Sequence, residues 1–131
     1  MGFFVNVSNT PSTSWPKGQL ASAKYVAKTD QIIDLPFPKI SHEFSLAEVH
    51  DAARLLLVKI LDVGPRKELV VHVMGESSML FTLVDALHSY RVRTLCSTME
   101  PKIVETILPD GSVSKTEVYE FHRFRDYFYL F

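Results

Sequence analysis

The sequence predicts an α/β protein with a Rossmann-like, mostly parallel open sheet, flanking helices and a C-terminal β-hairpin. Three observations support this prediction. An apolar strand from Leu69 to Met74, a glycine and a helix are followed by a second buried strand that starts at Thr94, which is a βαβ unit with a right-handed crossover. Two further strand–helix pairs precede this unit. Pro109-Asp110-Gly111-Ser112 is a strong turn signal between two strand-like runs near the C-terminus.

The first third of the chain predicts two strands separated by a helix. Phe3 to Val7 is a short apolar strand, and Gln31 to Leu35 is the second strand, which Pro36-Phe37-Pro38 stops. Pro16 fits the first turn of the intervening helix, where its missing N–H is no loss, and the helix continues through Lys28.

The middle of the chain predicts two amphipathic helices. Ser45 and Glu48 form a capping box, in which each side chain satisfies a free backbone N–H of the other, at the start of a helix that reaches about Leu61. Ser77 or Ser78 is expected to cap the helix after Gly75, because a serine oxygen accepts from first-turn amides. Apolar residues then recur at spacings of three and four through Leu87.

The end of the chain predicts a β-hairpin. Its arms are Lys102 to Leu108 and Lys115 to Phe124, and the second arm is rich in aromatic residues. The apolar tail from Tyr127 to Phe131 is expected to pack on the core or on a second subunit.

Composition narrows the class of protein. The 131 residues, 47% apolar and 22% charged, predict one globular domain spanning residues 1–131. A formal net charge of −1 makes duplex nucleic acid an unlikely partner. Cys96 is the only cysteine, which favours a reducing, cytoplasmic location. No apolar run approaches about 18 residues, so we expect no membrane span.

Three polar loops are predicted to meet at one edge of the sheet. They follow the first, third and fourth strands and comprise Ser8 to Trp15, Gly75 to Ser78 and Ser97 to Glu100. Ligands of open α/β sheets bind outside the carboxyl ends of the parallel strands. This convergence is the main functional indication in the sequence.

The turn after the third strand is a candidate phosphate site. Gly75, Ser77 and a helix N-terminus can hold a phosphate through backbone N–H groups. Glu76 would repel a bare phosphate, so its expected role is that of a ribose or adenine acceptor or a general base. The motif lacks the spaced glycines of a dinucleotide fingerprint and the lysine of a Walker loop, and an ordinary strand–helix turn is the more common interpretation.

The other loops offer donors and one aromatic ring. Ser8, Asn9, Ser97 and Thr98 can donate to phosphate or ribose, although loop residues of these types commonly cap local structure. Trp15 can stack on a base, or it can act as a hydrophobic staple for the first helix.

Charged and titratable residues elsewhere give weaker indications. Arg123 and Arg125 can reach phosphates bidentately, or they can be paired on a solvated strand face. The five histidines have no metal-binding spacing, and we expect no metal and no cofactor. His72 lies in the middle of a strand, where a hydrogen-bonded core histidine is more common than a catalyst.

Several short motifs spread over most of the chain resemble one family. They are Phe4-Val-Asn-Val-Ser-Asn-Thr-Pro-Ser with Trp15 and Gln19, Asp34-Leu-Pro-Phe-Pro, His72-Val-Met-Gly-Glu76, Cys96-Ser-Thr98 and Phe121-His-Arg-Phe-Arg-Asp-Tyr127. Together they are similar to small, stand-alone CRISPR-associated proteins that are relatives of the CARF (CRISPR-associated Rossmann fold) domains of type III systems. The resemblance implies a CARF-like homodimer that binds cyclic oligoadenylate, most simply cyclic tetra-adenylate.

The resemblance also implies an activity and a set of residues. Several such proteins are ring nucleases, which cleave the messenger without metal and leave 2′,3′-cyclic phosphate ends. Glu76 and Ser97 become the catalytic candidates. The implied ligand-binding residues are Ser8, Asn9, Ser12, Trp15, Gly75, Ser77, Thr98 and Arg123. One departure concerns the cation: Met99-Glu100-Pro101 separates the Ser-Thr step from Lys102, so Lys102 or Arg123 is considered for the scissile phosphate.

Two alternatives stay open beside the ring nuclease. One is a non-catalytic sensor of the same messenger that controls a partner protein, and the other is a Rossmann-like nucleotide-binding protein unrelated to CRISPR. The chain contains no recognisable effector domain, which favours an enzyme that removes the signal.

Overall fold

The computed structural model describes residues 2–130 and has the predicted α/β architecture. Five strands and three helices alternate through most of the chain, with short 3-10 turns at Ser12–Ser14 and Arg66–Glu68. The elements are β1 (Phe3–Val7), α1 (Lys17–Ala27), β2 (Ile32–Asp34), α2 (Leu46–Leu61), β3 (Leu69–Val73), α3 (Ser77–Ser89), β4 (Arg93–Ile107) and β5 (Val113–Asp126).

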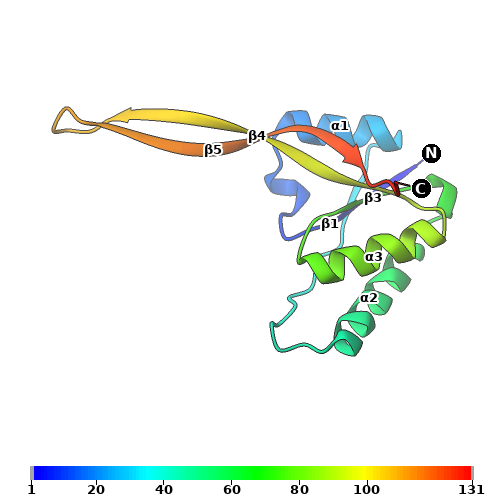
Figure 1. Ribbon diagram of the computed structural model, residues 1–131. Helices are drawn as coiled ribbons and strands as arrows, with labels where there is room; N and C mark the ends of the chain where they lie inside the picture. The colour runs from blue at the N-terminus through cyan, green and yellow to red at the C-terminus, as the bar shows by residue number, and fades with distance from the viewer. Residues whose placement is uncertain (1, 131) are drawn as a thin grey trace.

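One sheet forms the centre of the molecule. Its strand order is β2-β1-β3-β4-β5, with the first four strands parallel and β5 antiparallel to β4. Helix α1 covers one face, and α2 and α3 cover the other (Figure 1). The mostly parallel sheet with flanking helices and a C-terminal hairpin is therefore confirmed.

Each face of the sheet has its own core. The larger core joins β1 and β3 to α2 and α3, where Ile60, Met79 and Leu83 are fully buried. The smaller core lies under α1 and contains Phe4 and Leu95. The chain leaves β1 toward β2 but later returns to β3 on the other side of β1, so the sheet has its topological switch point between β1 and β3. Ligand sites of such sheets form at this point.

Helix capping agrees with the sequence at one helix and corrects it at another. The Ser45–Glu48 capping box at the start of α2 is confirmed. Neither Ser77 nor Ser78 caps α3, because Glu76 is the N-cap and its carboxylate accepts from the Ser78 and Met79 amides. The longer glutamate side chain reaches both amides at once.

The hairpin differs from the prediction in length. Ser97 to Glu100 is not a loop, because β4 runs without interruption from Arg93 to Ile107. Strand β5 pairs with β4 from Leu95 to Ile107. A register shift between Thr98 and Met99 marks a β-bulge. Beyond the bulge the two strands project from the body as a two-stranded arm (Figure 1), which we define as residues 99–121.

The apolar tail is divided between the core and solvent. Tyr127 packs on the larger core and donates to the backbone oxygen of Val73 at 2.7 Å, while Phe128 and Leu130 are exposed. Phe131, which the tail prediction included, lies outside the described residues. Within residues 2–130, no helix is long and apolar enough to cross a bilayer.

Candidate functional site

A row of polar side chains crosses four neighbouring strands on the α1 side of the sheet. Asp34 of β2, Asn6 of β1 and His72 of β3 are direct register partners. Leu95 of β4 continues this register, and Ser97 lies two residues further on, so strand alternation places it on the same face. We call Asp34, Asn6, His72 and Ser97 the polar row.

Hydrogen bonds connect the polar row from end to end. Asn6 Nδ2 donates to Asp34 Oδ1 at 2.9 Å. Asn6 Oδ1 lies 2.9 Å from His72 Nδ1, and His72 Nε2 lies 2.7 Å from Ser97 Oγ. Asn6 and His72 are almost completely buried, where polar groups need partners of this kind.

The surrounding bonds fix the direction of each hydrogen. Asn6 Nδ2 has two acceptors, Asp34 Oδ1 and the Thr10 carbonyl, so Asn6 Oδ1 faces His72 and also accepts from Ser8 Oγ at 2.8 Å. His72 Nδ1 must then carry the hydrogen, which leaves Nε2 free to accept from the Ser97 hydroxyl.

The protonation state of His72 agrees with this arrangement. Desolvation by burial lowers the pKa of His72 from 6.5 to about 4, because a charged imidazolium is disfavoured away from water. His72 is therefore neutral at pH 7, with a free acceptor nitrogen directed at Ser97.

Ser97 opens into a cavity at the carboxyl ends of β1 and β3, beside the first half of β4. The cavity has a volume of about 290 Å³, and its wall contains Ser8, Trp15, Gln19, His72 and Ser97. Gln19 Nε2 donates to Ser97 Oγ from α1 at 3.4 Å. Within the described part of the chain, no lysine or arginine lines this cavity. It is a small pocket at the switch point of the sheet, with a mostly apolar wall into which a few polar side chains are set.

Trp15 has an intermediate position between wall and core. Its ring makes edge contacts with Phe4 and His72, at centroid distances of 6.0 and 5.3 Å, and only 7% of the residue is exposed. Packing thus accounts for most of the ring, while its edge remains part of the cavity wall.

The turn after β3 is separate from the pocket. The Glu76 carboxylate accepts hydrogen bonds from the first free amides of α3, those of Met79 and Ser78. These bonds lower the pKa of Glu76, and the bond from Met79 N–H has the largest effect. Gly75 lies against Phe37, so closely that a Cβ atom there would be 2.5 Å from the ring. Ser77 is the exposed first residue of α3. None of the three lines the pocket.

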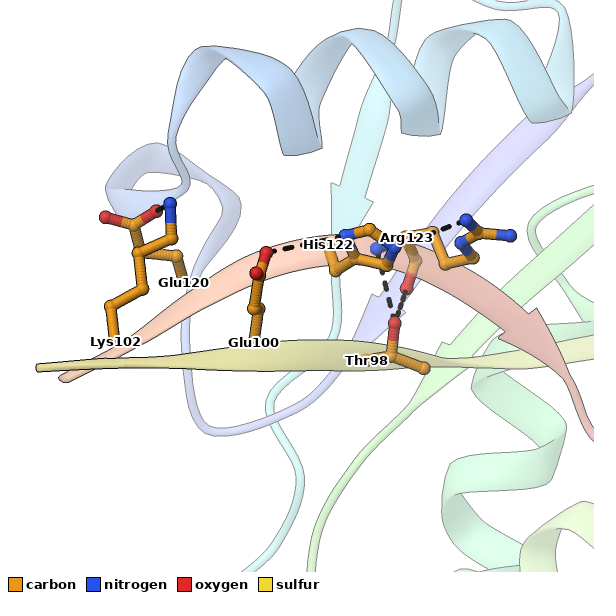
Figure 2. Close-up of polar contacts among 6 residues, drawn as sticks. All are labelled: Thr98, Glu100, Lys102, Glu120, His122 and Arg123. Atoms are coloured by element: carbon orange, nitrogen blue, oxygen red, sulfur yellow. Dashed lines mark hydrogen bonds and ion pairs between the residues drawn. The ribbon is translucent and has the colours of Figure 1, made fainter. Parts of the chain in front are cut away.

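The remaining predicted residues are distributed around the same edge. Ser12 donates through its hydroxyl to Asp34 Oδ2 at 2.8 Å and so supports the polar row from outside. Asn9 is exposed beside it in the loop after β1. Thr98 lies on the opposite face of β4 from Ser97, where its hydroxyl donates to the backbone oxygen of Arg123 at 2.8 Å. Figure 2 shows this pair beside the charged side chains of the arm.

The two candidate cations have other neighbours. Arg123 Nη2 lies 3.2 Å from His122 Nε2, and Lys102 Nζ forms an ion pair with Glu120 at 3.0 Å. Neither residue lines the pocket. Residues 2–130 also contain no group of three or more histidine, cysteine, aspartate or glutamate side chains that could hold a metal ion.

The sequence predicted that Ser97, Ser8 and Trp15 lie near a ligand, but it did not predict the centre of the row. His72 is the buried, hydrogen-bonded histidine that was expected, yet its contact with Ser97 was not. One indication was available: Asn6 and His72 are each the single polar residue, at the fourth position, of an otherwise apolar strand.

The fold and the pocket define a Rossmann-like α/β protein with a polar site at the carboxyl edge of its sheet. The family model described as "Uncharacterized protein MJ1673 family" matches residues 3–125, so the chain belongs to that family. No curated protein and no solved structure matches the chain.

Proposed function

We propose that this protein binds a cyclic oligoadenylate, with cyclic tetra-adenylate as the first candidate, and opens the ring as a metal-independent nuclease. In this role it switches off type III CRISPR signalling. The motif resemblance suggests the ligand, and one structural observation carries the chemistry: a serine hydroxyl that faces a pocket is hydrogen-bonded to a buried, neutral histidine.

The reaction is a transesterification within the RNA ring. A ribose 2′-oxygen attacks the adjacent phosphorus, the 2′-O–P bond forms, and the P–O5′ bond breaks. The product is a linear oligonucleotide with a 2′,3′-cyclic phosphate and a free 5′-hydroxyl. The 2′-hydroxyl loses a proton, and the departing 5′-oxygen gains one.

The polar row supplies an acceptor for the first proton. Ser97 Oγ accepts the 2′-hydroxyl proton as its own proton passes to His72 Nε2. On the opposite side of the imidazole, His72 Nδ1–H donates to Asn6 Oδ1, which holds the side chain in place. General-base assistance contributes about 10²–10⁴-fold to a rate when the pKa of the base lies near the working pH, and the pKa of about 4 for His72 favours the lower end of that range. The resulting imidazolium can return its proton toward the 5′-oxygen through Ser97.

Binding depends on the other walls of the pocket. Gln19 and Ser8 present a side-chain amide and a hydroxyl, and Trp15 presents an aromatic edge. A ring of four adenylates has a two-fold axis. This symmetry suits a homodimer that forms one site around the two-fold axis of the dimer.

The test is incubation of the purified protein with labelled cyclic tri-, tetra- and hexa-adenylate in EDTA. We expect linear products with cyclic phosphate ends from the tetra-adenylate. Retention without turnover would instead identify a sensor of the same messenger. If the protein neither binds nor cleaves any of the three rings, the proposal is wrong.

A further inference from the structure

The arm is an extension that the body of its own chain does not cover. From Met99↔Phe121 to Ile107↔Val113 the two strands pair only with each other, and almost every residue along them is exposed. A two-stranded ribbon is only marginally stable alone in water. An extension of this length therefore needs a surface to pack against.

The two faces of the arm differ sharply in chemistry. One face carries the ion pair of Lys102 with Glu120 and, at 3.8 Å, the contact of His122 with Glu100 (Figure 2). This is the pattern of a solvated face.

The opposite face is mostly apolar. Strand alternation and the register place large side chains from both strands on it: Met99, Ile103, Ile107, Val113, Tyr119 and Phe121. Ile103, Ile107 and Tyr119 are 70%, 78% and 61% exposed. The face begins at Met99, which is also part of the pocket wall, so the apolar surface is continuous with the proposed site.

We propose that the apolar face of the arm packs on the same face of a second copy of this chain, around a two-fold axis that passes beside the pocket. A second copy suits the charges on this face, because Glu105 and Lys115 already pair near the tip at 3.6 Å and only Glu117 is left among the described residues there. A highly charged partner would find no complementary field on a surface of this kind.

The size of the arm indicates how far the contact must extend. Nine residue pairs at about 3.3 Å each, and a ribbon about 10 Å wide, hide on the order of 600 Å² in two stacked arms. Stable interfaces begin at about 1,200 Å² in total. The second copy must therefore also cover the surface where the arm joins the body, which is the rim of the pocket.

This contact would complete the site, a consequence that rests on the proposed function. Among residues 2–130 the pocket has polar groups but no cationic side chain on its wall, whereas a phosphodiester substrate requires its negative charge to be balanced. A second copy across the rim is the nearest source of further side chains.

The test compares two lysine substitutions that differ only in the face of the arm. Ile103→Lys places a charge on the apolar face, opposite Glu117, where the cross-strand pair favours the hairpin itself. Val104→Lys is the matched control on the charged face, and Val104 is also exposed. Oligomeric state is measured by sedimentation velocity on the full chain without ligand, with circular dichroism to confirm folding.

We expect the wild type and Val104→Lys to be dimers and the dimer dissociation constant of Ile103→Lys to rise at least about tenfold, since burying a lysine in an apolar contact carries a large desolvation cost even when Glu117 of the same chain lies opposite it. A monomeric wild type, or an Ile103→Lys dimer as tight as the wild type, would overturn the arm proposal. Because no ligand is present, this result is independent of ring cleavage. If the dimer depends on the arm but neither binds nor cleaves any cyclic oligoadenylate, the arm proposal is supported and the proposed function is wrong.

Discussion

The sheet body and the arm distribute polar and apolar side chains in opposite ways. In the body, Asn6 and His72 are 1% and 2% exposed and lie among valines and aromatic rings. On the arm, Ile103 and Ile107 are more than two-thirds exposed. Each arrangement is unfavourable unless something compensates for it.

The compensation differs between the two regions. Every buried side-chain nitrogen and oxygen of residues 2–130 has a hydrogen-bond partner, so the polar row is complete within one chain. The apolar side chains of the arm are not covered by any other part of residues 2–130. The row therefore has the character of a preorganised site, and the arm that of a surface that still has to be covered.

The sharpest way to test the role of the row is to remove the end that faces the pocket, which is Ser97. Ser97→Ala deletes the hydroxyl that faces the pocket and should lower ring cleavage by about 10²–10⁴-fold, and the loss of the donor to His72 Nε2 should lower the free energy of unfolding by about 1–3 kcal/mol. The measurement is single-turnover cleavage of cyclic tetra-adenylate. Cleavage at the wild-type rate would separate the row from the chemistry.

Removing the middle of the row tests whether the body depends on it. Asn6→Leu leaves the buried His72 Nδ1 without its acceptor and should lower the free energy of unfolding by about 2–4 kcal/mol. Thr106→Val, a polar-to-apolar change on the exposed arm, should stay within about 0.5 kcal/mol. Urea denaturation of both variants makes the comparison, and equal losses would mean that the row is no more important to stability than the arm.

Acid should weaken the body through His72. Its pKa is about 4 in the folded protein and 6.5 in the unfolded chain, so between these values the unfolded state binds more protons and stability falls as the pH decreases. From pH 7.5 to 5 the loss is about 2 kcal/mol. His72→Gln should show a flatter pH dependence of unfolding than the wild type, and superimposable profiles would contradict this assignment.

The smallest expected effect on activity comes from the turn after β3. Glu76→Ala removes the α3 cap and should lower the melting temperature slightly while cleavage stays near the wild-type rate, because the carboxylate is bonded to α3 and lies outside the pocket. Glu43→Ala, in the connector before α2, is the matched control. A large loss of cleavage in Glu76→Ala alone would restore its predicted catalytic role.

The order of strands and helices could be predicted because periodicity and turn residues are local properties. The Ser45–Glu48 box and the Pro109–Ser112 turn each act within a few residues, and the structure has both the capping box and a hairpin around that turn. Ser97 was expected in a loop, yet it lies in β4. The length of β4 depends on pairing with β5, about 25 residues away, which no local pattern encodes.

The sequence could predict at which edge of the sheet the site lies, but it could not predict which side chains meet on one face of the sheet. Parallel strands bring the loops after β1 and β3 to one edge, and Ser8 and Trp15 do share a pocket with Ser97. Which residues meet there depends on the register between strands. That register joins Asn6 to His72 across 66 residues and leaves Glu76 with α3 on the other side of the sheet.

The most direct measurement is ¹⁵N NMR of the His72 ring during titration with cyclic tetra-adenylate in EDTA. The imidazole is expected to be neutral at pH 7 with its hydrogen on Nδ1, and the Nε2 resonance should move as the ligand reaches Ser97. The Ser97→Ala variant, which is expected to cleave slowly, should still bind and show a smaller change. A His72 ring that is protonated at pH 7, or one that is unaffected while the ligand binds elsewhere, would contradict the proposed site.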